Sequence, residues 1–248
     1  MSNPTLREEV FNSPLRNDSL EVEKVMTSSG AMLKTCILGL FVALTFGYTW
    51  SLISAGFMDK ASILLTVGGV GGFILALIIC FAPKNNYLAV TTPVYAMLEG
   101  LFLGAVSAMF NQMYPGIVFQ AALGTILTIF GMFILYSTRI IKMTDTLARV
   151  IFISTFAIAG IYIIQFLLSF FHLSIPGIFT NSPIGIAFSL VVVCVAAFNL
   201  LVDFYFIERF SGQAPKYMEW YGAFSLMVTI VWLYLEILKL LAKIISRR

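Results

Sequence analysis

The sequence contains few charged residues, and this scarcity excludes most soluble folds. Only 11% of its 248 residues are Asp, Glu, Lys or Arg, whereas 60% are hydrophobic. A soluble domain carries about 25% charged residues, because polar groups must cover its surface. The mean hydropathy of +0.96 therefore predicts a polytopic membrane protein whose main partner is the lipid bilayer. The net charge of +3 comes with no basic patch, so we expect no nucleic-acid partner.

Histidine and cysteine are also scarce, and this excludes several kinds of catalytic or metal site. The chain has a single histidine, His172. One histidine excludes a zinc site of the HExxH type and leaves none inside an apolar run for a serine–histidine dyad. Cys36, Cys80 and Cys194 lie far apart within apolar runs, so we expect small buried hydrophobic side chains. We therefore predict that the protein is not an enzyme and has no resident metal or cofactor.

Long apolar runs make up most of the remaining sequence. After a polar, charged segment at 1–29, seven runs of about 20 residues follow, the length at which a helix spans ~30 Å of hydrocarbon. The runs are 33–56, 62–82, 88–110, 116–138, 147–171, 184–207 and 218–241. Strands are excluded because open sheet edges do not occur in lipid and because the strands of outer-membrane barrels have only about 10 residues. The sequence thus predicts an all-α membrane protein with a cytoplasmic polar tail (1–29) and a domain of seven transmembrane helices (30–248).

Basic residues in the loops predict the orientation of the chain. Cytoplasmic loops collect Lys and Arg. Alternate loops do so here, with Lys84, Arg139, Lys142, Arg149, Arg209 and Lys216. This bias places the amino terminus in the cytoplasm, and seven full spans then place the carboxyl terminus outside. The carboxyl end is itself basic and prefers the inside, so the last segment either spans fully, which we favour, or turns back.

Glycines inside the apolar runs have two interpretations. Gly68-Gly69-Val70-Gly71-Gly72 has the glycine content of a phosphate loop, but it lacks the Lys-Ser/Thr ending and lies at membrane depth. We therefore expect this stretch, like Gly100 and Gly104, to let helices pack closely.

Carboxylates within the apolar runs are the candidate functional groups. Glu99 lies mid-way along the third run, Asp203 near the inner end of the sixth and Glu236 near the far end of the seventh, which Glu219 opens. A carboxylate at bilayer depth costs several kcal/mol. The structural alternatives are a protonated packing residue for Glu99, a snorkelling acid for Asp203 and an ion pair between Glu236 and Lys239, three residues further on.

The last two runs form an antiparallel hairpin about a turn near Gly212. Residues equidistant from the turn share a depth, so Asp203 is expected to lie level with 219–224 and, with some slack, Thr229. At ~1.5 Å per residue, Glu236 lies about 20 Å deeper. It is therefore not expected to contact Asp203 unless the last segment turns back.

The hairpin sequences NLLVDFYFI and AFSLMVTIVWLYLEILKLL, within a seven-span plan, resemble the Bax-inhibitor family (transmembrane BAX inhibitor motif, YccA-like). The stretches PVYAMLEGLFLGAVS and APKYMEWYGAF resemble a bacterial subgroup of it, and the resemblance covers about 33–245. It implies six helices wrapped around a central carboxy-terminal seventh, in a multi-pass protein of the cell inner membrane. It also implies a pH-sensitive calcium leak, gated by one aspartate on span six and one on span seven that share a proton.

The resemblance assigns the first aspartate to Asp203. The longer match of the last run places Thr229 at the second, whereas the local LYLE would place Glu236 there, against the depth argument. The acidic pair is then broken, unless Glu219 or Glu99 substitutes. We expect a cation leak channel, with Ca²⁺ as the leading ion, Asp203 as gate or ligand and Glu99 as a second lining acid. The alternative is a non-conducting regulator that binds a membrane protease of the FtsH type.

Overall fold

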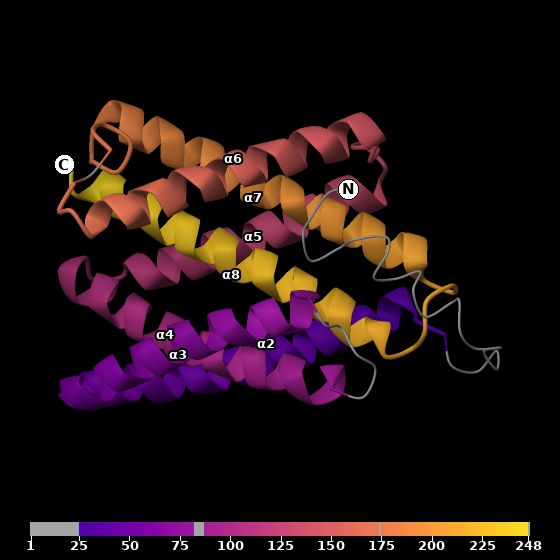
Figure 1. Cartoon of the computed structure of the whole chain (residues 1–248), viewed down its shortest axis with the longest axis horizontal. Helices are drawn as coiled ribbons and strands as arrows, with labels where there is room; N and C mark the ends of the chain where they lie inside the picture. The colour runs from indigo at the N-terminus through magenta and orange to yellow at the C-terminus, as the bar shows by residue number, and fades with distance from the viewer. Residues whose placement is uncertain (1–24, 82–86, 174, 248) are drawn as a thin grey trace. The chain divides into compact units, whose positions relative to one another are not determined.

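The computed structural model describes residues 25–81, 87–173 and 175–247, so Lys84 of the orientation prediction lies outside the described residues. The helices are α2 (Ser28–Ser54), α3 (Met58–Phe81), α4 (Leu88–Met113), α5 (Ile117–Ser137), α6 (Asp145–Ser169), α7 (Pro183–Phe210) and α8 (Met218–Ile245) (Figure 1). All seven are long and apolar enough to cross a membrane. The predicted all-α transmembrane fold is therefore confirmed.

Local sequence explains where the helices begin. Thr27 is the N-cap of α2, and its hydroxyl accepts a hydrogen bond from the Gly30 N–H at 3.0 Å. Thr144 caps α6 in the same way, accepting from the Leu147 N–H at 3.2 Å. Each hydroxyl satisfies one of the backbone donors that a helix leaves open at its first turn. Gly116 precedes α5 with φ of +85°, a conformation that glycine adopts at little cost.

The chain forms two compact units, and both α7 and α8 contribute to each of them. The first, which we call the α2–α4 unit, contains α2, α3, α4 and the segment Asp203–Val228. That segment is the end of α7, the α7–α8 turn and the start of α8. The second, the α5–α6 unit, contains α5, α6, α7 as far as Val202 and α8 from Thr229 onward.

Glycines bring the helices of the α2–α4 unit close together. A Cβ atom at Gly100 would collide with α2, and one at Gly104 would lie 2.6 Å from the Phe46 carbonyl oxygen. A Cβ at Gly68 of α3 would lie 2.6 Å from the Leu98 carbonyl oxygen of α4. Only a residue without a side chain permits such an approach of two backbones. The prediction that these glycines serve helix packing is confirmed.

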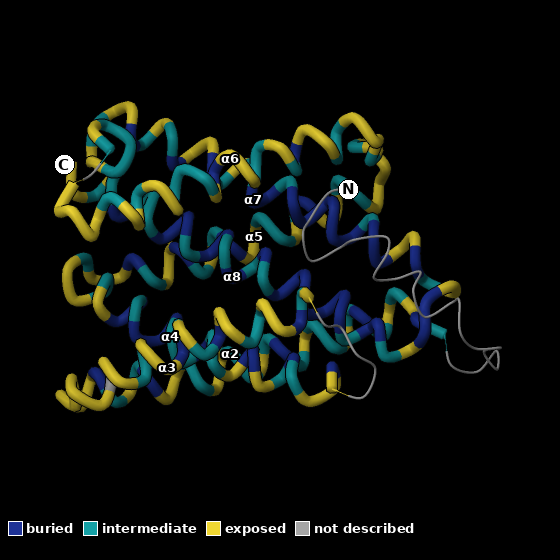
Figure 2. Tube along the Cα trace, in the orientation of Figure 1, coloured by how far each residue is buried: buried dark blue, intermediate teal, exposed yellow. Residues whose placement is uncertain are grey.

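Burial differs between the helices. In the most apolar stretch of α8, 61% of the residues are buried, against at most 44% in any other helix. Figure 2 shows the difference as the dark blue and teal trace of α8. Among the described helices, α8 is thus the most buried.

The three cysteines are less buried than predicted. Cys36 and Cys194 are exposed and Cys80 is half-buried, so the expectation that all three would be buried is wrong. The physical reason is that the outer face of a membrane helix contacts lipid rather than water. A small apolar thiol therefore avoids water equally well on that face and inside the bundle.

Candidate functional site

Asp203 is held between the last two helices. It lies on α7, and its side chain is fully buried, with 0% exposure. Ser225 of α8 is equally buried, and its hydroxyl donates a hydrogen bond of 3.0 Å to Asp203 Oδ1. Both residues belong to the α2–α4 unit. Hairpin symmetry predicted α8 as the facing helix, and the observed partner is one residue beyond the predicted 219–224 stretch.

Glu99 is connected to the same part of α8 indirectly, by way of Tyr95. It is half-buried on α4, and the Tyr95 hydroxyl hydrogen-bonds its carboxylate. The carboxylate faces α3, where a Cβ at Gly72 would lie 3.2 Å from Glu99 Oε1. The Tyr95 ring packs edge-on against Phe224, with centroids 4.9 Å apart. Glu99 and Asp203 are thus connected to consecutive positions of α8, Phe224 and Ser225.

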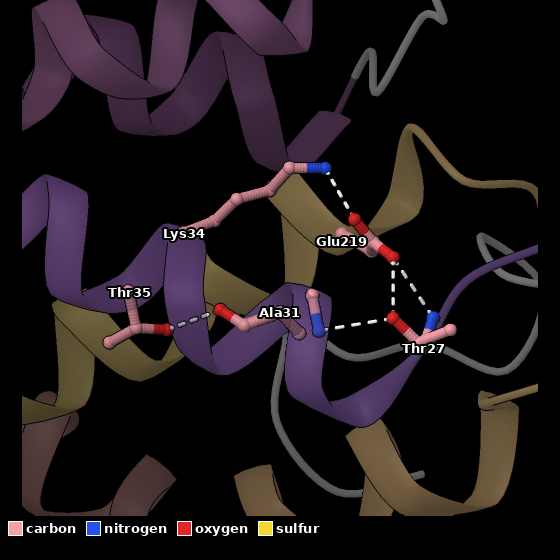
Figure 3. A network of polar contacts seen from close by, with 6 residues as sticks. Thr27, Ala31, Lys34, Thr35 and Glu219 are labelled. Atoms are coloured by element: carbon pink, nitrogen blue, oxygen red, sulfur yellow. Dashed lines mark hydrogen bonds and ion pairs between the residues drawn. The ribbon is translucent and has the colours of Figure 1, made fainter.

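Glu219 lies in the first turn of α8 and anchors the amino end of α2 (Figure 3). Its Oε2 accepts a hydrogen bond of 2.6 Å from Lys34 Nζ. Its Oε1 accepts hydrogen bonds from the Thr27 N–H at 3.0 Å and from the Thr27 hydroxyl at 2.9 Å. Lys34 Nζ also lies 5.0 Å from the centre of the Trp220 ring. A carboxylate engaged in this way is a positioning group, because its charge is already compensated.

Glu236 is bound within the α5–α6 unit. It is 1% exposed, and it accepts hydrogen bonds from the Tyr162 hydroxyl at 2.8 Å and from Lys239 Nζ at 3.0 Å. The ion pair that the three-residue spacing predicted is therefore confirmed. Helix α8 runs without a break from Met218 to Ile245, so the last segment does not turn back within it.

Thr229 occupies the position that the longer family match assigns to the second aspartate. It is 3% exposed and follows Ser225 by one helical turn, so both hydroxyl-bearing residues lie on one face of α8. This face offers hydroxyl oxygens rather than a second carboxylate. In the part of the chain that the structure describes, no group of three or more His, Cys, Asp and Glu side chains is placed to hold a metal ion.

Lys243, near the basic carboxyl end, is hydrogen-bonded within the α5–α6 unit. Lys243 Nζ donates three hydrogen bonds, to the carbonyl oxygens of Ile178 and Gly185 at 3.0 Å each and to the Ser189 hydroxyl at 2.9 Å. These oxygens compensate the ammonium charge locally.

Sequence reasoning missed several partners of the candidate acids, namely Ser225, Lys34, Thr27 and Tyr162. The depth argument for the hairpin predicted a partner close to Ser225, because it requires only counting residues from the turn. The other partners lie on segments that are far from the acids in the sequence, and no local pattern marks them.

A family model described as "Bax inhibitor 1 like" matches residues 3–246. No curated protein and no solved structure matches the chain. The matched region includes all seven helices and the α7–α8 hairpin that carries Asp203 and Glu219. On this match over nearly its whole length, the chain belongs to the Bax inhibitor 1 like family.

Proposed function

We propose that this multi-pass protein is a cation leak channel of the bacterial inner membrane, that it passes Ca²⁺, and that Asp203 controls permeation. The observation that supports the proposal is the complete burial of the Asp203 carboxylate beside the Ser225 hydroxyl. Burying a carboxylate among apolar helices costs several kcal/mol. A passing cation offsets this cost, and the same carboxylate lowers the barrier for the cation.

The chemistry of the two side chains suits Ca²⁺. A serine hydroxyl both donates and accepts, so Ser225 can bond to the carboxylate when no ion is present and turn a lone pair toward an ion that arrives. Carboxylate and hydroxyl oxygens are hard ligands of the kind that Ca²⁺ prefers. Glu99 supplies a second carboxyl group, hydrogen-bonded by Tyr95, whose ring packs against Phe224, next to Ser225.

Ca²⁺ uptake into liposomes that contain a trapped calcium dye tests the proposal. Asp203→Asn keeps the shape of the side chain and removes its charge, and it should slow uptake about tenfold or more. The passing cation loses its attraction to the carboxylate, and each loss of about 1.4 kcal/mol corresponds to a factor of ten. Asp145→Asn is the matched control, since Asp145 is an exposed carboxylate at the start of α6. Uptake by the wild type no faster than by empty liposomes would refute the channel. Faster uptake by Asp203→Asn would assign Asp203 to the closed state rather than to ion binding.

A second candidate function is regulation of a membrane protease of the FtsH type through the polar tail. The observation that favours it is the fixed exit point of the tail, because the Met26 N–H donates to the Ala214 carbonyl of the α7–α8 turn at 2.7 Å. Deleting residues 1–24 removes the part of the tail that precedes this anchor and leaves the anchor in place. The deletion should abolish the effect on substrate turnover, whereas a variant with residues 1–24 scrambled controls for composition. Unchanged protease inhibition by the deletion variant would exclude the tail as the docking element.

A further inference from the structure

The residues that precede α2 are bound to the α7–α8 turn by backbone hydrogen bonds. The Met26 N–H donates to the Ala214 carbonyl at 2.7 Å, and the Gly212 N–H donates to the Met26 carbonyl at 2.8 Å. Val25 and Pro215 form an antiparallel bridge next to them. A segment expected to belong to a cytoplasmic tail is thus part of the α2–α4 unit.

The side chain of Met26 lies next to the contact between α7 and α8. It is fully buried, and a Cβ at Gly222 of α8 would lie 3.4 Å from Met26 Cε and 3.1 Å from Ile207 Cγ1 of α7. Ile207 follows Asp203 by one turn of α7, and Gly222 precedes Ser225 by about one turn of α8. Met26 is therefore packed one helical turn from the hydrogen bond that holds the proposed gate.

Glu219 holds the same segment from the other side. Besides its two hydrogen bonds from Thr27, it fills the space next to Gly30, where a Cβ atom would collide with its carboxylate. The Ser28 N–H adds a hydrogen bond of 3.1 Å to the Ser211 hydroxyl in the turn. The position of residues 25–30 against the turn thus depends on the Glu219 carboxylate and on the absence of a side chain at Gly30.

We propose that residues 25–30 form a latch, with Met26 and Glu219 as positioning residues for Asp203. When the latch is seated, Met26 sets the spacing of α7 and α8 and keeps the Asp203–Ser225 pair buried. When it is released, the hairpin loosens and water reaches Asp203, which increases permeation. The effect on permeation rests on the proposed channel function, whereas the effect on the hairpin does not.

Amide hydrogen exchange measures the hairpin without reference to conduction. In Gly30→Ala the new methyl group displaces the Glu219 carboxylate, so amides in 203–228 should exchange about tenfold faster or more. Gly47→Ala is the matched control, because it lies on the same helix and a Cβ there would have nothing within 4 Å. Equal exchange in the two variants overturns the latch. If Gly30→Ala does not fold, Met26→Ala compared with the conservative Met26→Leu provides the same test.

An engineered, reducible disulfide tests whether the latch controls Ca²⁺ uptake. Val25→Cys with Pro215→Cys, in a chain whose three native cysteines are replaced by alanine, joins a bridged pair whose Cα atoms are within disulfide reach. Gly30→Ala should raise Ca²⁺ uptake about tenfold, the oxidised staple should restore the slow uptake, and a reductant should reverse the rescue. Uptake that does not respond to the staple overturns the latch as a control of permeation. Absence of uptake in every variant, with faster exchange in Gly30→Ala, contradicts the channel proposal and leaves the latch standing.

Discussion

Replacing Gly104 with alanine tests how closely α2 and α4 pack. A Cβ at this position would lie 2.6 Å from the Phe46 carbonyl oxygen and 3.0 Å from Thr49 Cβ. Favourable contacts between carbon atoms begin at about 3.5 Å. The carbonyl belongs to the backbone of α2 and has no rotamer to change. The added methyl group therefore requires α2 as a whole to move away by roughly 0.5–1 Å.

Two opposing terms set the size of the effect. Alanine is a better helix former than glycine by about 1 kcal/mol. Overpacking costs about 1–3 kcal/mol, and the upper part of this range applies because the obstacle is backbone. We expect Gly104→Ala to lower the free energy of unfolding by about 1–2 kcal/mol. At Gly47 of α2, where nothing lies within 4 Å of the added Cβ, only the first term acts, and alanine should stabilise the protein by about 0.5–1 kcal/mol.

The two substitutions are expected to change the free energy of unfolding in opposite directions, so comparing them gives a clear test. Unfolding of the purified protein by increasing SDS in mixed micelles, followed by tryptophan fluorescence, should shift in opposite directions for Gly104→Ala and Gly47→Ala. Combining Gly104→Ala with Gly100→Ala should cost less than the sum of the two, because α2 has already moved. A Gly104→Ala variant that is as stable as Gly47→Ala would refute close packing of these two helices.

Further predictions concern the α5–α6 unit and the family match. Tyr162→Phe should lower stability by about 1.5–3 kcal/mol in the same SDS titration, because it removes the hydrogen bond to the Glu236 carboxylate; Tyr48→Phe, at an exposed tyrosine, should not. Lys243→Met removes three hydrogen bonds and should speed amide exchange in 178–189, whereas Lys142→Met at an exposed lysine should leave it unchanged. Thr229→Asp adds a carboxylate one turn from Ser225, and Ca²⁺ uptake should gain a dependence on pH near neutrality; a flat pH profile would contradict the longer family match.

The spans were predictable because lipid thickness and local pattern determine them. The predicted seventh run begins at Met218, where α8 begins, since the polar turn before it and the apolar run after it are both visible in the sequence. The ion pair of Glu236 and Lys239 follows from helical periodicity alone. Of the two interpretations of the glycines inside the apolar runs, helix packing was favoured from the sequence, because two helix backbones approach closely only at residues without side chains.

The contacts of the site were less predictable because they join distant segments. The polar composition of 1–29 predicted a tail, yet Thr27 binds Glu219, and nothing in its local sequence distinguishes a docked residue from a solvated one. With Gly212 as the assumed centre of the hairpin, Asp203 was predicted to lie level with 219–224. The observed pair of Asp203 and Ser225 is centred near position 214. The reason is that the turn between the end of α7 at Phe210 and the start of α8 at Met218 is itself centred there, beyond Gly212.

The contact between Gly30 and Glu219 also constrains how relatives of this protein can vary. Because a side chain at position 30 would occupy the space of the carboxylate, the two positions cannot change independently. A relative with alanine or serine at position 30 should carry a shorter residue at 219, and it should then lose the basic residue at 34 that the carboxylate binds here. An alignment of relatives should therefore show these three columns changing together, as a correlated group linking the first and last transmembrane helices.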